Sequence, residues 1–95
     1  MKVYFVATMR SLENTSTRTV GYFKTQKDAI RCVEGNYGDI YEEGFYKYAI
    51  IECVSDGLYQ YDLNPLFFEW NKEKQQYIRI ERPEQFKNVI GFTIG

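Results

Sequence analysis

The chain has 95 residues, 44% of them hydrophobic, with 12 basic and 13 acidic side chains for a formal net charge of −1. This length fits a single domain, and the near-neutral charge excludes a general nucleic-acid binder, which would be more basic. The chain has no histidine, which excludes Ser–His–Asp and Cys–His nucleophile systems and histidine-containing zinc sites.

The first third of the chain has the pattern of a β-hairpin followed by one helix. Residues 2–9 alternate with largely apolar side chains on both faces, so we expect this strand to be covered on both sides. A polar loop separates it from a second strand over residues 17–23. Thr25 and Asp28 form a capping-box-like helix start, and residues 35–36 supply the stop. This helix is too short to be stable alone, so it should pack on the sheet.

The rest of the chain predicts further antiparallel strands. Residues 37–44 are acidic with a glycine near each end and predict a loop or a single extra turn. The strongest strand signal covers residues 45–54 and turns through residues 55–57 into a return strand over 58–62. The remaining pattern comprises strands over 66–70 and 76–82, a short helical turn opened by Pro83, and a last strand over 89–95.

This order of elements predicts a single α+β domain over residues 1–95. We expect a mostly antiparallel sheet of about six to seven strands, with one main helix packed on one face. A short helical turn should precede the last strand.

The cysteines and the distribution of apolar residues predict in which cellular compartment the protein is found. Cys32 lies in the helical pattern and Cys53 in a strand pattern, and free buried thiols are the simplest expectation. A disulfide between them stays open. The N-terminal stretch lacks a signal-peptide core, and no apolar run approaches the ~18 residues of a membrane span. We therefore expect a cytoplasmic protein that does not cross a membrane.

The strand over residues 45–54 has apolar side chains on both faces. Its Ile51 face should form the core under the helix, whereas the opposite face carries Tyr46 and Tyr48. We place Tyr4 of the first strand on that same face. Exposed aromatic patches are typical of interfaces. The pattern therefore predicts a homo-oligomer, most simply a dimer, with Tyr4, Tyr46 and Tyr48 at its interface.

Two arginine–tyrosine pairs are candidates for ligand binding. Arg79 alternates with Tyr77 in one strand, and Arg18 alternates with Tyr22 in another. An arginine beside a tyrosine can hold a phosphate while the ring stacks on a base. A surface arginine lying over an aromatic ring is the simpler structural explanation for each pair. These four residues form the predicted site for a small anionic ligand.

Carboxylates are weaker candidates. Asp39, Glu42 and Glu43 could hold Mg²⁺ or Ca²⁺, but the calcium-loop pattern is absent, so a solvated acidic loop is the simpler interpretation. Glu52 is either a rim or ion-paired residue or a buried acid. We expect no cofactor, no metal and no enzymatic activity, with a carboxylate-bound Mg²⁺ enzyme as the less favoured alternative.

Two segments, "FKTQKDAIRCVEGNYGDIYEEGFYKYAIIECVSDGLY" and "WNKEKQQYIRIERPEQFKNVIGFTIG", resemble small uncharacterised proteins of Firmicutes and their phages. The shared features are a helix opening with T-x-x-D/E-A, YAIIE-like and G-L-Y segments, and a P-E-x-x-K-N-x-x-G-F ending. The resemblance covers most of the chain and transfers no function residue by residue. Since small phage proteins often counter host defence, it implies an anti-defence protein.

The residues and the resemblance together predict a non-enzymatic viral binding protein. As an oligomer in the host cytoplasm, it would act as a sponge that sequesters a small anionic, nucleotide-type immune signal. The alternative is a protein–protein inhibitor or adaptor that blocks a host effector protein through an aromatic or acidic surface.

Overall fold

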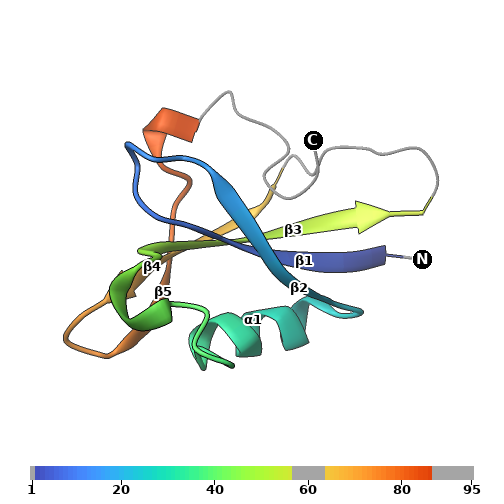
Figure 1. Cartoon of the computed structure of the whole chain (residues 1–95). Helices are drawn as coiled ribbons and strands as arrows, with labels where there is room; N and C mark the ends of the chain where they lie inside the picture. The colour runs from blue at the N-terminus through green and yellow to red at the C-terminus, as the bar shows by residue number, and fades with distance from the viewer. Residues whose placement is uncertain (1, 57–63, 87–95) are drawn as a thin grey trace.

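The computed structural model describes residues 2–56 and 64–86, which form an α+β fold with one antiparallel sheet (Figure 1). The strands pair in the order β2-β1-β3-β4-β5, and every neighbouring pair is antiparallel. The elements are β1 (Lys2–Met9), β2 (Thr17–Phe23), α1 (Gln26–Glu34), the 3-10 turn η1 (Glu42–Gly44), β3 (Tyr48–Ser55), β4 (Leu66–Asn71), β5 (Gln76–Ile80) and the 3-10 turn η2 (Glu84–Phe86).

The α+β class and the antiparallel sheet are confirmed, and the expected six to seven strands are slightly more than the described residues show. The described residues form five strands. The strands predicted over residues 58–62 and 89–95 lie outside the described residues. β3 begins at Tyr48 rather than at Phe45, because η1 and the residues after it turn the chain first.

Local hydrogen bonds explain where helix α1 begins and ends. Thr25 is in an extended conformation, and its hydroxyl accepts a hydrogen bond from the Asp28 backbone N–H at 3.2 Å. At the other end the Gly35 N–H donates to the Arg31 carbonyl at 2.9 Å. The buried face of the helix comprises Ala29, Cys32 and Val33.

The Thr25 cap offers a direct test of the helix start. Thr25→Ala is expected to lower the free energy of unfolding by ~0.5–2 kcal/mol, because it removes the acceptor for one N-terminal backbone N–H. Thr25→Ser keeps a hydroxyl at this place and should retain most of the stability. Urea unfolding of the three proteins measures this, and equal midpoints for all three would show that the cap contributes nothing.

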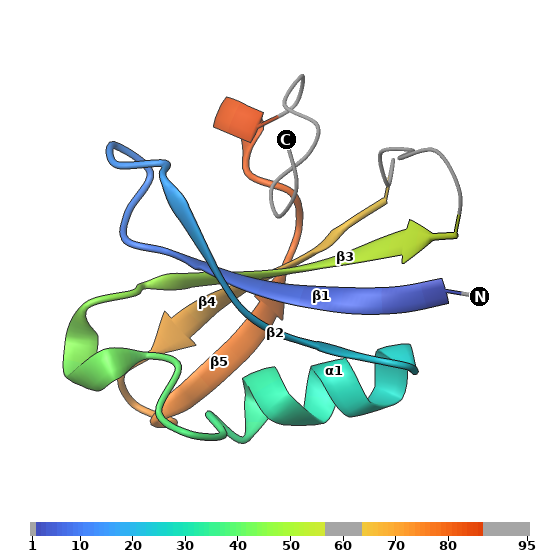
Figure 2. The same ribbon diagram turned by 45° about the vertical axis from the view of Figure 1, so that its right-hand side comes forward.

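The two faces of the sheet carry separate hydrophobic clusters. Figures 1 and 2 show α1 on one side of the sheet and η2 on the other. The helix-side cluster contains Val6, Ala29, Val33, Ile40, Ala49, Ile51, Phe68 and Tyr77. The opposite cluster contains Met9, Tyr48, Ile50, Phe67 and Phe86. Val6 and Ala7, neighbours on opposite faces of β1, are both fully buried, which confirms that this strand is covered on both sides.

The expectation that Tyr4, Tyr46 and Tyr48 share one exposed face is wrong. Tyr4 pairs with Cys53, which places its side chain on the helix side, where it packs against the helix-side cluster. Tyr48 lies on the other face, is only 6% exposed, and donates a hydrogen bond to Glu69 Oε2 at 3.2 Å. Burial, followed by the nearby Glu69 carboxylate, raises the pKa of Tyr48. Tyr46 precedes β3 and is half-buried.

The structure also tests the expectations about the two cysteines and about a helix that could cross a membrane. Neither cysteine forms a disulfide; Cys32 lies on the buried face of α1, and Cys53 is half-buried. Burial raises the pKa of the Cys32 thiol. Within residues 2–56 and 64–86, no helix has the length and apolar character needed to cross a membrane.

Candidate functional site

Tyr77 is part of the core and cannot stack on a ligand as the sequence suggested. Its ring is fully buried and meets the Trp70 ring edge-on, with centroids 5.1 Å apart. Its hydroxyl donates a hydrogen bond of 2.5 Å to the Tyr46 carbonyl, which ties β5 to the segment that enters β3. Burial is the main cause that raises the pKa of Tyr77. Tyr77 is therefore a buried residue that packs against Trp70, one of the residues that line the site described below.

The raised pKa of Tyr77 predicts a loss of stability in alkali. Below about pH 10 the phenol is neutral in both the folded and the unfolded chain, so its full contribution is present. Above that pH the unfolded chain ionises first, and stability falls as the pH rises. Urea unfolding at about pH 8 and about pH 11 should show a smaller decrease for Tyr77→Phe than for the natural protein. Identical decreases would mean that Tyr77 ionises as freely in the folded chain as in the unfolded one.

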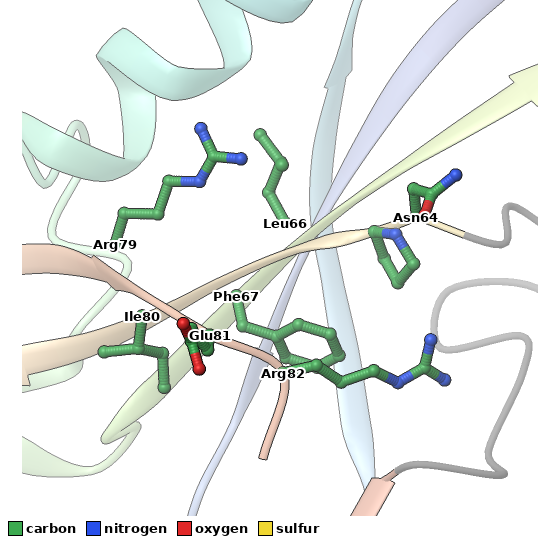
Figure 3. A pocket seen from close by; sticks show the side chains of 8 residues that line it. Asn64, Leu66, Phe67, Arg79, Ile80, Glu81 and Arg82 are labelled. Atoms are coloured by element: carbon green, nitrogen blue, oxygen red, sulfur yellow. The ribbon is translucent and has the colours of Figure 1, made fainter.

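Arg79 is exposed, whereas Tyr77, the aromatic residue with which the sequence paired it, is buried. Arg79 lies at the rim of a pocket of about 550 Å³ beside the ends of β4 and β5, with Leu66, Phe67 and Arg82 among the lining residues (Figure 3). The side chains of Arg79 and Arg82 extend in different directions in that view. Arg82 Nε already donates to the Phe86 carbonyl at 2.7 Å. The two arginines therefore do not converge on a single anion.

A β-bulge separates Arg18 from Tyr22. Ala7 pairs with Thr19 and Val6 with Gly21, so Val20 is an extra residue in β2. Simple alternation put Arg18 and Tyr22 on one face, and the extra residue reverses the phase between them. Arg18 lies on the helix side, whereas Tyr22 pairs with Phe5 on the other face and is 62% exposed. The predicted Arg18–Tyr22 site is therefore wrong as a pair.

Arg18 instead belongs to a cluster of arginines on aromatic rings at the end of the sheet where β3 begins. Its guanidinium carbon lies 4.6 Å from the centre of the Tyr46 ring. Arg10 lies over the neighbouring Phe45 ring at 4.7 Å. The Phe45 and Tyr46 rings meet edge-on with centroids 4.8 Å apart. Two arginine–aromatic stacks thus lie side by side.

Strand pairing brings these four residues together. Met9 at the end of β1 pairs with Tyr48 at the start of β3 and with Thr17 at the start of β2. Arg10 directly follows Met9, and Arg18 directly follows Thr17. The Lys47 N–H donates to the Arg10 carbonyl at 3.3 Å, which fixes the segment before β3 against the end of β1.

The first of two adjoining hollows, here called the Arg10 pocket, has a volume of about 310 Å³. It combines three cations with three aromatic rings and is lined by Arg10, Ser11, Tyr41, Gly44, Phe45, Lys47, Trp70 and Lys72. The Tyr41 and Trp70 rings are stacked with centroids 3.8 Å apart and planes within 8° of parallel. The Trp70 backbone N–H donates to the Lys47 carbonyl at 2.8 Å, so the strand that carries Trp70 is held against the residue directly before β3.

The second hollow, here called the Arg18 pocket, has a volume of about 150 Å³. It is lined by Arg10, Asn14, Ser16, Thr17, Arg18, Phe45 and Tyr46. Arg10 and Phe45 line both pockets, so the two hollows share a wall and form one bipartite site.

The charges at this bipartite site do not cancel. Arg18 forms an ion pair with Glu42, and Lys47 lies 3.5 Å from a carboxylate oxygen of Glu69. Among the residues that the structure describes, Arg10 and Lys72 make no ion pair. The Arg10 pocket therefore has two uncompensated positive charges beside its aromatic rings.

The acidic segment that borders the site has an unusual backbone. Positive φ angles occur at Asn36, Gly38, Asp39, Glu42, Glu43 and Gly44. This left-handed region is costly for residues other than glycine, so contacts must hold the segment in place. Asn36 supplies one of them, because its Oδ1 accepts from the Tyr41 N–H at 2.9 Å. The result is a fixed loop that directs Tyr41 and Glu42 toward the site.

The carboxylates have structural partners. Glu42 binds Arg18, and the Asp39 side chain accepts from Asn36 Nδ2 at 3.2 Å. In the described part of the chain no group of three or more acidic or cysteine side chains converges as a metal site would require. Glu52 is 1% exposed, so its side chain is buried and the expected rim position is wrong.

Sequence reasoning missed most of the bipartite site. Arg10 begins the polar loop between the first two predicted strands, where a solvated charge is the simplest interpretation, and Phe45, Lys47, Trp70 and Lys72 show no pattern that marks them as ligand residues. Their distance along the chain concealed their proximity. One signal was present: Arg10 follows one strand directly, and Phe45 precedes a second strand that is a natural antiparallel neighbour.

Comparisons with protein-family models, with curated proteins and with solved structures found no match to this chain. The fold and the site define its class as a small α+β protein with a basic, aromatic, bipartite surface site.

Proposed function

We propose that the protein is a non-enzymatic binding protein for a small anionic ligand of nucleotide type. The observation that carries this proposal is the Arg10 pocket, where Arg10 and Lys72 lie beside Phe45 and Trp70 without carboxylate partners. A nucleotide offers one group for each half of this combination, a phosphate for the cations and a base for the rings.

The chemistry of the pocket favours a phosphate over a bare hydrophobic ligand. Arginine presents donors in a planar fork that matches two phosphate oxygens, and lysine adds a point charge. A base can lie against exposed ring surface, and Phe45 is 47% exposed. Small-molecule sites measure about 300–1,000 Å³, so a pocket of about 310 Å³ suits one nucleotide rather than a large cofactor.

The biological role in this proposal is sequestration. In this role an oligomer in the host cytoplasm holds a nucleotide-type immune signal, and the cations and aromatic rings of the Arg10 pocket are what favour such a ligand over a blocked effector protein. A site with binding groups and no arrangement of nucleophile and base fits retention of a ligand better than its conversion.

A protein–protein inhibitor is the second candidate function. Exposed aromatic side chains favour it, namely Tyr22, which is 62% exposed, and Tyr37, which is 57% exposed. Such rings are common in protein interfaces. They lie on different elements, β2 and the loop after α1, and this scatter makes the candidate weaker than the ligand-binding protein.

The proposed dimer needs a contact surface other than Tyr48. Tyr48 is buried within the monomer, so a charged residue in its place would disrupt the core rather than test an interface. The exposed Tyr22 on the edge strand β2 is a better position. Sedimentation at tens of micromolar should show a dimer, whereas a monomer at that concentration would refute this part of the proposal.

Trp70 provides the test of ligand binding. It is the only tryptophan in the chain and lines the Arg10 pocket, so its fluorescence comes from a residue of that pocket. Titration with AMP, ADP and cyclic di-AMP should give a saturable change in fluorescence with at least one of them. Adenosine, which lacks a phosphate, should bind more weakly. No change with any phosphate-bearing probe, together with no heat in calorimetry, would refute the proposal in favour of the inhibitor.

A further inference from the structure

We propose that the Arg18 pocket is a second anion subsite and that Glu42, which does not line this pocket, pairs with the Arg18 guanidinium in the free protein. The inference rests on the proposed function and specifies its ligand class: a nucleotide with two phosphate groups, one for Arg10 and one for Arg18. Glu42 then acts as an internal competitor that a ligand with two phosphates displaces.

The position of Arg18 favours this inference. Its guanidinium group is oriented by the Tyr46 ring at 4.6 Å, as the Arg10 guanidinium is oriented by Phe45 at 4.7 Å. The Phe45 and Tyr46 rings are in contact, so the two cations lie over neighbouring rings. A ligand that contacts both arginines has to extend only past Arg10 and Phe45, the two residues that line both pockets.

The bound carboxylate shows that the Arg18 place accepts an anion. Glu42 reaches it from a left-handed backbone conformation with φ of 50°, so the local chain is bent toward Arg18 at some conformational cost. Both side chains of the pair remain more than 40% exposed, at 44% and 43%. Exposed pairs of this kind contribute little to stability, so a phosphate can replace the carboxylate.

The size of the Arg18 pocket limits what it can hold. A volume of about 150 Å³ is about half that of the Arg10 pocket and falls below the usual range for whole small molecules. Its lining includes the polar side chains Asn14, Ser16 and Thr17, which suit phosphate oxygens better than a base. We therefore assign the base and one phosphate to the Arg10 pocket and the second phosphate to Arg18.

The experiment compares ligands that differ in their number of phosphates. Calorimetry with AMP, ADP and cyclic di-AMP measures the preference of the natural protein for two phosphates over one. ADP carries them adjacent and cyclic di-AMP carries them apart, so the better of the two also reports their spacing. We expect a preference of roughly tenfold or more, the usual effect of one additional charged hydrogen bond.

Two glutamate variants separate local competition from general charge. Glu42→Gln should bind the preferred two-phosphate probe about three- to tenfold more tightly, since the competitor has lost its charge. Its affinity for AMP should stay unchanged. Glu43→Gln removes the same charge from the adjacent residue, which makes no ion pair with Arg18, and should change neither affinity.

Arg18→Ala should abolish the preference for two phosphates while AMP still binds. Equal changes in Glu42→Gln and Glu43→Gln, or a preference that survives in Arg18→Ala, would overturn the inference. AMP binding without any preference would also overturn it and would leave the proposed function intact. No binding of any probe would overturn both. Thermal melting of each variant confirms that it is folded.

Discussion

Ile51→Ala is expected to lower the free energy of unfolding by ~2–5 kcal/mol, the largest stability effect among these predictions. Ile51 is 1% exposed in the central part of β3 and belongs to the cluster under α1. Removal of its side chain leaves a cavity that the two neighbouring strands, β1 and β4, can only partly close. Since a domain is stable by only ~5–15 kcal/mol, this loss is a large fraction of the total.

Two further variants provide the comparison for the stability of Ile51→Ala. Ile51→Val removes one methyl group and should cost only ~0.5–1.5 kcal/mol. Lys74→Ala, in the exposed turn between β4 and β5, should have little effect. Urea unfolding of the three variants should rank them in that order. An Ile51→Ala protein as stable as Lys74→Ala would mean that β3 does not lie at the centre of the sheet.

The fold was predictable wherever short-range chemistry decides the structure. The Thr25 cap and a left-handed stop, which the structure places at Asn36 rather than at Gly35, were predictable because capping depends on residues three to four positions apart. Alternation also put Ile51 on the face beneath that helix. The prediction that Tyr4 and Tyr48 share one face of the sheet was wrong, because the relative orientation of side chains in two strands depends on the register between those strands.

Arg10→Ala is expected to weaken nucleotide binding roughly ten- to a hundred-fold, the largest effect on affinity among these predictions. Arg10 lines both pockets and has no ion-pair partner within the described residues, so its charge is available to a phosphate. Arg10→Lys should lie between the natural protein and Arg10→Ala, because it keeps the charge but loses the planar fork. Stability should change little, since Arg10 is exposed.

Arg79→Ala is the matched control. Arg79 is also an exposed arginine at a pocket, but that pocket lies beside the ends of β4 and β5. Its removal changes the net charge by the same amount and should leave affinity within about twofold of the natural protein, as expected for a distant charge in physiological salt. The reverse pattern, a loss in Arg79→Ala but none in Arg10→Ala, would place the ligand at the larger pocket.

The candidate site was less predictable than the fold because long-range pairing assembles it. Arg10, Arg18 and Phe45 lie on three separate segments, and only the pairing of β1 with both β2 and β3 brings them together. The bulge at Val20 separates Arg18 from Tyr22, and although the neighbouring Gly21 is a residue typical of bulges, simple alternation does not include the extra residue. Residue chemistry correctly indicated that arginine and aromatic rings were the groups to examine, but it could not match the partners.

The most direct test of ligand binding at the Arg10 pocket is an NMR titration of the ¹⁵N-labelled protein with ADP and cyclic di-AMP. The Trp70 indole N–H and the backbone amides of Ser11, Phe45 and Lys47 should shift together and saturate at one ligand concentration. The amides of Arg79 and Glu81 at the other pocket should stay in place. Shifts centred on Arg79 and Glu81, or none with either probe, would contradict a nucleotide site at Arg10.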